Sequence, residues 1–291
     1  MILWIFLILS AGVYCWWDGG HMLIAEIGFR DLDDASKTKL LTLMNAWAPE
    51  FSSDIFELAT WADAVKAPPL SIESMAGWHF KDIVYNPENI SLPNSAKLEV
   101  ENVAWALADA MHSLSDPTTK STWAWNFNIR NIVHFTGDIH CPVHAVTMYS
   151  SKFPDGDRGA NDFKLGGARE CDKELHFYWD SAGCNYMSSY PPSPAVVHDI
   201  KQNATDIITK YPKSFFPQFK DGDTDFEAWS LETHNVAVNN VYKGIMLGSI
   251  PSETYHKNTF KVAQQQIALA GYRLGSLLKM LAKNIPQSHE E

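Results

Sequence analysis

Long apolar runs are almost absent from this sequence of 291 residues. The one run near the amino terminus, over residues 1–13, is too short to span a membrane, and no later stretch reaches the roughly 18 apolar residues that a spanning helix needs. Val13 and Cys15 stand at the minus-three and minus-one positions of a cleavage after Cys15, as in a secretory signal peptide. We therefore expect a signal peptide over 1–15 and a secreted, soluble domain over 16–291 without a membrane anchor.

Cysteine is also scarce. Cys15 leaves with the signal peptide, so that Cys141, Cys171 and Cys184 remain. An odd number of cysteines in an oxidising compartment implies one bridge and one free thiol, or an intermolecular pair. We favour a Cys171–Cys184 disulfide, because Cys141 lies in a stretch rich in metal-ligating side chains. The secretory route also permits N-glycosylation at two sequons, which begin at Asn89 and Asn203.

Positively charged residues are also few relative to negatively charged ones. The chain has 23 Lys and Arg against 34 Asp and Glu, which gives a formal net charge of −11. Most nucleic-acid-binding proteins meet phosphates with a basic groove, and this composition argues against such a groove. Apolar residues, by contrast, make up 46% of the chain, and no segment is repetitive. The chain can therefore bury a full core, in one large domain or two tightly joined lobes.

Helical spacing of apolar residues covers most of the chain. Predicted helices occupy residues 21–32, 36–47, 53–66, 99–114, 121–139, 174–180, 195–211, 226–247 and 252–282, with Ser36 and Ser53 capping the second and third. Residues 77–85 alternate in polarity and predict a short extended segment. The glycine-rich residues 155–167 predict a loop or a small hairpin. We expect a mostly α-helical domain with one small β-hairpin or loop region.

The densest group of possible metal ligands lies between residues 134 and 144. On a helix, His134 and Asp138 are four residues apart and share one face, and His144 returns to roughly the same side. His140 falls elsewhere and is the spare histidine. A single buried histidine is more often a core residue than a ligand, but imidazole and carboxylate groups at this density favour a transition-metal site.

A second source of ligands lies at the predicted cleavage point. Cleavage after Cys15 would free the α-amine of Trp16, five residues before His21. An amine and the carbonyl of the same residue can chelate a metal as a five-membered ring, and the pair Gly19-Gly20 lets the chain turn back toward His21. Removal of the signal peptide is therefore a possible activation step.

Further acidic and histidine residues extend the set. Alone, Asp63 could be a helix-surface carboxylate, His79 a strand histidine and Asp180 a partner for a lysine, whereas His176 and Asp180 together have helical i, i+4 spacing. All are types that zinc accepts. The nine candidate metal ligands are Trp16, His21, Asp63, His79, His134, Asp138, His144, His176 and Asp180.

The ordered set of motifs resembles the class I zinc-dependent nucleases, which are secreted single-strand nucleases and 3′-nucleotidases of the mung bean nuclease type. The likeness extends through nearly all of the mature chain. It is carried by Trp16 with Gly20-His21, Trp61-Ala62-Asp63, His79-Phe80-x-Asp82, His134-Phe-x-Gly-Asp138 with Pro142-Val-His144, Gly159-Ala160-Asn161-Asp162, Leu175-His176-x-x-Trp179-Asp180, and Ala270-Gly271-Tyr272-Arg273-Leu274.

The resemblance implies a mostly helical fold with three zinc ions as cofactors. One zinc would be bound by Asp63, His79, His134 and Asp138. Its neighbour would be bound by the Trp16 amine and carbonyl, His21 and the same bridging Asp138. The third would be bound by His144, His176 and Asp180. These ions contribute a charge of +6, so the loaded chain would carry about −5, with its positive charge concentrated at the metals.

The resemblance also implies a mechanism. Two ions that share Asp138 can hold a hydroxide that attacks phosphorus, and the third can stabilise the departing 3′ oxygen. We expect Asp63, Asp138 and Lys66 to act in catalysis, with Lys66 stabilising charge on the phosphate. The expected substrates are 3′-nucleotides and the phosphoester bonds of single-stranded RNA and DNA. The products would carry 5′-phosphates.

Four residues are assigned to substrate binding by the same resemblance. Phe80 would stack on a base, which demands an unpaired strand but accepts any base, and Asp82 would bond the base edge. Asn161 would also touch the base, and Gly159 would allow its close approach. No obligate protein partner is evident.

Three departures from the family stand out. Ala182 occupies the position of a second stacking aromatic residue found in some relatives, Cys141 occupies that of a common glutamine, and Ala160 replaces a common glycine. Two alternatives remain: a zinc-dependent phospholipase C, which shares the three-zinc plan in bacteria, and a secreted, zinc-stabilised binding protein without catalytic activity.

Overall fold

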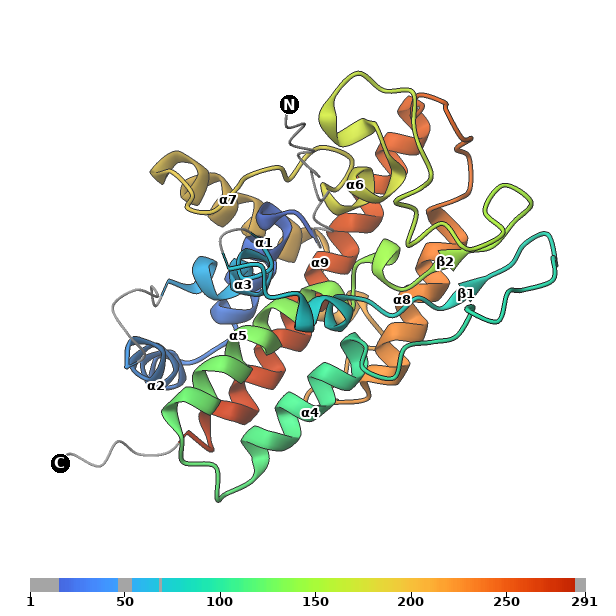
Figure 1. The fold of residues 1–291 in the computed structure, drawn as a ribbon. Coiled ribbons are helices and arrows are strands. Elements are labelled where there is room, and N and C mark those ends of the chain that lie inside the picture. The colour runs from blue at the N-terminus through green and yellow to red at the C-terminus, as the bar shows by residue number, and fades with distance from the viewer. Residues whose placement is uncertain (1–15, 47–53, 68–69, 286–291) are drawn as a thin grey trace, which may run out of the picture.

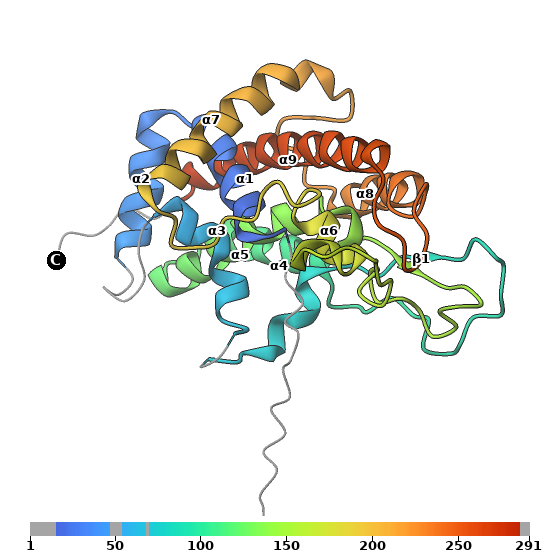
Figure 2. The ribbon, with the colours of Figure 1, turned by 90° about the horizontal axis from the view of Figure 1, so that it is seen from above.

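The carboxy-terminal helix α9 (Glu253–Ala282) crosses the molecule from one side to the other, and α1 (Asp18–Arg30) packs along it (Figures 1 and 2). The computed structural model describes residues 16–46, 54–67 and 70–285. Glycines bring the two helices close together, because a Cβ at Gly271 would lie 2.5 Å from Ile27 and one at Gly28 would lie 2.9 Å from Leu274. Among the described helices, none is long and apolar enough to cross a membrane.

The other described elements are mostly helices. They are α2 (Asp34–Asn45), α3 (Ile55–Ala64), α4 (Val103–Ser115), α5 (Thr122–Asp138), α6 (Leu175–Asp180), α7 (Pro194–Lys210) and α8 (Phe226–Asn240), with the 3-10 turns η1 (Glu73–His79), η2 (Pro142–His144), η3 (Glu170–Asp172) and η4 (Lys213–Phe215). Strands β1 (Val84–Tyr85) and β2 (Thr147–Met148) pair in parallel, with Val84 opposite Thr147. The prediction of a mostly α-helical fold is confirmed.

The helices pack around α1 and α5. Helix α1 contacts α9, α3, α7 and α5, and α5 in turn contacts α4, α3 and α9. In Figure 2, α7 and α9 form the upper part of the molecule, with α3, α4 and α5 beneath them. The core between them is apolar and includes the fully buried side chains of Ile24, Leu107, Ile129 and Leu277. This arrangement brings the start of α1 close to the end of α5.

Several predicted helix boundaries were wrong. Asp33, not Ser36, caps α2, and its carboxylate accepts a hydrogen bond from the backbone N–H of Ser36 at 2.7 Å. Asp54 caps α3, while the expected cap Ser53 and the expected end of the second helix, Trp47, lie outside the described residues. An aspartate carboxylate is at least as good an acceptor for these backbone donors as a serine hydroxyl.

Two other segments also differ from expectation. Residues 77–79, expected to be extended, belong to η1, and only Val84–Tyr85 within 77–85 forms a strand. Helix α8 ends at Asn240, seven residues before the predicted end. Gly244 and Gly248 follow with positive φ values of 81° and 77°, which end helical geometry.

The predicted Cys171–Cys184 disulfide is present and ties η3 to the residues that follow α6. Cys141 is a buried, free thiol. The disulfide closes a loop around the short helix α6, which has only six residues and would be marginal alone. It therefore stabilises the segment that carries His176 and Asp180.

Candidate metal centre and adjoining cavities

The ends of several elements converge on one buried cluster of histidines and aspartates. His21 comes from the start of α1, Asp63 from the end of α3, His134 and Asp138 from the last turns of α5, and His176 and Asp180 from α6, while His79 ends η1 and His144 ends η2. None of these eight residues is more than 5% exposed. The structure thus brings together all the predicted side-chain ligands.

Asp138 lies at the middle of this cluster. Its Oδ2 is 3.0 Å from His79 Nδ1 and 3.3 Å from His134 Nε2, and its Oδ1 is 3.4 Å from His21 Nε2. His79 Nδ1 and His134 Nε2 lie only 3.2 Å apart. One carboxylate therefore faces three imidazoles at once, a geometry that suits a carboxylate shared by two ions.

Asp63 closes the cluster on the side of α3. Its Oδ1 is 2.7 Å from Lys66 Nζ, 3.6 Å from His79 Nδ1 and 3.7 Å from His134 Nε2. The sets His21, Asp63, His134 and His79, His134, Asp138 each place one ligand atom per residue within 4.8 Å of the others. The residues proposed for the first two ions thus form one continuous group.

A second group lies beyond it. His176 Nε2 is 3.0 Å from Asp180 Oδ2, and His144 Nε2 is 3.5 Å from Asp180 Oδ1. The thiol of Cys141 donates to Asp180 Oδ1 at 3.1 Å, so that Cys141, His144 and Asp180 also form a compact set. Sequence reasoning placed Cys141 in the metal-rich stretch but did not include it among the nine ligands, and its contact with Asp180 joins residues 39 apart in the chain.

Backbone carbonyls fix the orientation of three of these histidines. His134 Nδ1 donates to Ala59 O at 2.6 Å, His144 Nδ1 to His79 O at 2.9 Å, and His176 Nδ1 to Gly159 O at 2.6 Å. A carbonyl only accepts, so each Nδ1 carries the proton and each Nε2 of a neutral ring is left as an acceptor. This is the usual arrangement around a metal-ligating histidine.

The residues present fit a transition-metal centre. Within the described part of the chain, His144 Nε2, Asp138 Oδ1 and both ring nitrogens of His21 make no hydrogen bond, although these side chains are at most 1% exposed. Buried polar atoms without partners cost free energy, and imidazole nitrogens together with carboxylate oxygens are ligands of zinc and its neighbours. Bound cations would take one ring nitrogen of His21, His144 Nε2 and Asp138 Oδ1 as ligands, while the other nitrogen of a neutral His21 ring carries the proton.

Burial and charge set the protonation of the cluster. Burial lowers the pKa of His79 to about 3 and also lowers that of His21, so both rings are neutral at physiological pH. Burial lowers the pKa of His134 too, but Asp138 and Asp63 outweigh it and raise the pKa above its ordinary value. Burial opposes ionisation of Asp138, yet the surrounding histidines hold its pKa well below the usual range. Because only unprotonated imidazole binds a metal, protons and metal ions compete for His134.

Trp16, the ninth candidate, lies against the same helix end. Its indole Nε1 donates to Gly137 O at 2.9 Å, and the side chain is fully buried. Gly137 is required there, since a Cβ at this position would lie 2.7 Å from His21 Nδ1. The backbone of Trp16 is thereby anchored next to the residue that precedes Asp138.

His140 lies outside the cluster, as expected of the spare histidine. Its Nδ1 donates to Thr136 O at 2.7 Å, and its Nε2 accepts from Arg273 Nη1 at 2.9 Å. Burial and the Arg273 charge hold the pKa of His140 well below its ordinary value. Its role is to join α5 to α9.

The predicted substrate-binding residues line one cavity of about 170 Å³ beside the second group. Its lining residues are Phe80, Asp82, Val143, His144, Arg158, Gly159, Asn161 and His176. The parallel pairing of β1 with β2, together with a hydrogen bond from Lys81 N to His144 O, aligns the segment of Phe80 with that of His144. Sequence reasoning missed Arg158, whose side chain extends from the same loop.

Backbone geometry explains the glycine in this loop. Gly159 has a φ of 63°, and a Cβ there would lie 2.6 Å from Val143 O. Ala160 has a φ of 67°, a conformation that glycine adopts without strain, which accounts for the glycine common in relatives. The loop continues into the hydrogen bond from His176 N to Ala160 O. It therefore positions a candidate metal ligand as well as a wall of the cavity.

Asp157 anchors this loop from beneath. Its Oδ1 accepts from Met148 N at 2.9 Å and its Oδ2 from Tyr242 Oη at 2.8 Å. Burial is the main cause that raises the pKa of Asp157 to about 6. The folded state therefore holds this proton more tightly than the unfolded state, in which the pKa is 3.8.

We predict that the stability of Asp157→Asn increases, relative to that of the unchanged protein, as pH rises. Asp157 contributes stability below pH 3.8 that is lost as pH rises through about 6, whereas asparagine does not titrate. The difference in the free energy of unfolding should shift in favour of the variant by roughly 2–3 kcal/mol between pH 4 and pH 7. Urea unfolding of both proteins between pH 4 and pH 7 measures this difference. Zinc release at low pH affects both proteins alike and therefore cancels in the comparison. A difference independent of pH would contradict this prediction.

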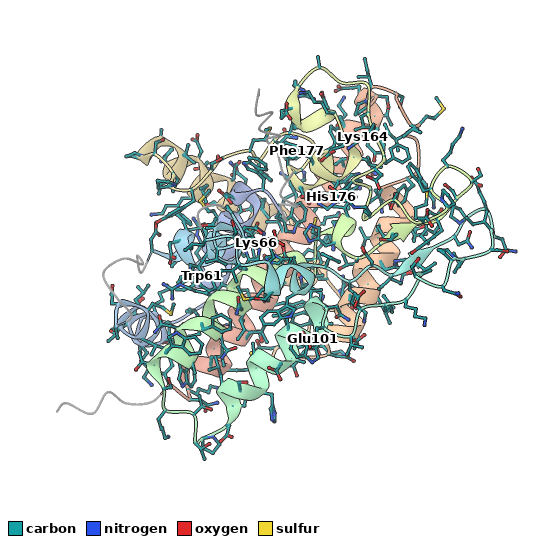
Figure 3. The ribbon with its side chains drawn as sticks, in the orientation of Figure 1. Trp61, Lys66, Glu101, Lys164, His176 and Phe177 are labelled. Carbon is teal, nitrogen blue, oxygen red and sulfur yellow. A yellow bond between two sulfur atoms is a disulfide. The ribbon has the colours of Figure 1, made fainter. Side chains whose placement is uncertain are left out.

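A second cavity of about 210 Å³ adjoins the first group of ligands. It is lined by Trp17, Asp18, Asp63 and Ser189. Figure 3 labels Lys66 just beyond α3, and His176 and Phe177 higher in the view on α6. A larger hollow, of about 480 Å³, lies between α2 and the end of α9, and its lining contains no histidine.

The chain is similar to one known protein family and to individual nucleases. The family model described as S1/P1 Nuclease matches residues 16–283. Endonuclease 2 of Arabidopsis thaliana is 24% identical to the chain, with 97% of the chain and 96% of the relative aligned. Nuclease S1 of Aspergillus oryzae is also 24% identical, with 95% of each protein aligned. The match begins at Trp16, the first residue of the predicted mature domain.

Proposed function

The chain belongs to the S1/P1 nuclease family, and from this premise we propose that it is a secreted, zinc-dependent endonuclease and 3′-nucleotidase. It hydrolyses the phosphoester bonds of single-stranded RNA and DNA and of 3′-nucleotides, and leaves 5′-phosphates. The observation that carries the proposal is the carboxylate of Asp138, which is fully buried and faces three imidazoles at 3.0–3.4 Å.

We assign three zinc ions to the cluster. Asp63, His79, His134 and Asp138 would hold one, the Trp16 amine and carbonyl with His21 and Asp138 a second, and His144, His176 and Asp180 the third. When bound, these ions would supply a hydroxide near neutral pH and stabilise negative charge at the phosphate and the leaving oxygen. The continuous contacts from Asp63 through Asp138, and the contacts of Asp180 with His144 and His176 at 3.0–3.5 Å, support this division.

The protein's own side chains position the substrate. Lys66 Nζ pairs with Asp63 and would offer a point charge to a non-bridging phosphate oxygen. Phe80 would stack on the base of the nucleotide whose 3′ oxygen leaves, with Asp82 and Asn161 at the base edge. Stacking on Phe80 requires an unpaired base, which is the physical reason for a single-strand preference.

The proposal also includes secretion of the protein and removal of its signal peptide. The expected signal peptide, residues 1–15, lies outside the described residues. The disulfide between Cys171 and Cys184 supports an oxidising compartment. Cleavage after Cys15 would create the Trp16 amine beside the start of α1.

Rates on five substrates test the function. We expect zinc-dependent phosphate release from 3′-AMP, cleavage of single-stranded RNA and DNA, much slower cleavage of duplex DNA, and no release of phosphocholine from phosphatidylcholine. Equal rates on single-stranded and duplex DNA would contradict the proposed role of Phe80, which is to stack on an unpaired base. Release of phosphocholine without nucleotide cleavage would favour a phospholipase C, and full zinc occupancy without any hydrolysis would favour an inactive binding protein.

A further inference from the structure

Two cavities adjoin the metal cluster, and they share no lining residue. The first contains Phe80 and contacts His144 and His176, whereas the second contains Trp17 and contacts Asp63. Asp63 and Asp180 belong to different groups of ligands. The cluster therefore lies between two separate spaces, only one of which holds the residues expected to bind the nucleotide base.

We propose that the second cavity is a subsite for the nucleoside on the 5′-phosphate side of the cleaved bond, with the indole of Trp17 as its stacking surface. This inference rests on the proposed function. The nucleoside whose 3′ oxygen leaves occupies the Phe80 cavity beside His144 and His176, and the phosphate lies at the cluster. The remainder of the strand then continues past Asp63 and Lys66, toward Trp17.

Trp17 is held as a rigid aromatic surface. Its ring stacks on Phe177, with centroids 4.6 Å apart and an interplanar angle of 21°. Its backbone N–H donates to Asp180 O at 3.0 Å, which ties the residue to the end of α6. Because the Trp17 ring is already held by stacking, it loses little conformational entropy when a ligand binds. The ring is half-buried and lines the cavity, so that a base can stack on its accessible surface.

The other residues around this cavity suit a nucleotide. Lys66 pairs with Asp63 at the edge nearest the cluster and offers positive charge to the strand backbone. Asp18 and Ser189 provide oxygen atoms for the sugar or the base edge, and Asp18 Oδ2 is fixed by Tyr190 N at 2.8 Å. The position at which some relatives carry a second aromatic residue is the fully buried Ala182, so that the aromatic surface of this subsite is supplied by Trp17 instead.

A pair of substrates isolates the subsite. Adenylyl-(3′→5′)-adenosine and adenosine 3′-(methyl phosphate) share the same scissile phosphodiester, but only the first has a downstream nucleoside. Trp17→Ala should raise KM for the dinucleotide by about tenfold or more, the loss expected for one stacked base, and change KM for the methyl ester less than about twofold. Trp17→Phe should restore most of the dinucleotide affinity, whereas Phe80→Ala should impair both substrates.

Equal losses on both substrates would overturn the proposal, because Trp17 would then act only by holding the neighbouring metal site. A binding measurement separates this outcome from failure of the proposed function. A dinucleotide phosphorothioate with 2-aminopurine as its downstream base should lose fluorescence on the zinc-loaded protein and not on Trp17→Ala. Quenching without hydrolysis of any substrate would preserve the subsite and reject the nuclease proposal, while equal quenching by both proteins would reject the subsite.

Discussion

Asp138→Asn should lower kcat/KM for 3′-AMP by about 1,000-fold and reduce the zinc content of the purified protein. Asparagine keeps the shape of the side chain but removes the charge that three imidazoles face at 3.0–3.4 Å. One substitution should therefore weaken two ions, because the same carboxylate belongs to both proposed sites. Zinc analysis by mass spectrometry and steady-state phosphate release measure the two effects.

Asp172→Asn is the matched control for this prediction. Asp172 is a buried aspartate, 5% exposed, and its Oδ2 pairs with Arg169 Nε at 2.8 Å outside the ligand cluster. Its loss should reduce stability without removing zinc or lowering the rate of the folded fraction. If Asp138→Asn retained three zinc ions and a normal rate, the assignment of Asp138 as the shared ligand would be wrong.

A single alanine added before Trp16 should cost the mature protein one zinc ion and about 100-fold in activity. The extension turns the α-amine, which has an ordinary pKa near 8, into an amide that cannot act as a ligand in its neutral form. The buried indole of Trp16, bonded to Gly137 O at 2.9 Å, leaves little room for the backbone to move away. Zinc content and phosphate release from 3′-AMP measure the change.

The control for the extended protein is the same preparation after the added alanine has been removed. Removal of the added alanine by an aminopeptidase regenerates the Trp16 amine in the same preparation and should restore both zinc and activity. A fully active protein with three zinc ions despite the added residue would show that the amine is not a ligand. Processing after Cys15 would then have no role in activation.

Much of this site could be predicted because its chemistry lies in short segments. His134 and Asp138 share one face of α5, and His176 and Asp180 share one face of α6, so helical spacing alone places each pair correctly. His144 was expected on the same side as His134, although it arrives through the turn η2 after the helix has ended. The sequence pattern was sufficient where neighbours in space are neighbours in the chain.

Contacts between distant segments could not be predicted in the same way. Cys141 contacts Asp180 only when α6 packs against η2, and Trp17 contacts Phe177 only when α6 packs against the residue that precedes α1. No local periodicity encodes these pairs, since they depend on tertiary packing across about 39 and 160 residues. The predicted helix caps were wrong for another reason, because serine and aspartate are nearly equivalent as caps and the sequence offers both residue types near the start of each helix.

The most direct test of the metal-centred account is to count zinc in the purified protein that begins at Trp16 and to measure phosphate release from 3′-AMP before and after chelation. We predict three zinc ions per chain, loss of release with the chelator, and recovery when zinc is restored. Phosphate release that persists in protein freed of metal would contradict the account, because no metal would then be needed at Asp138.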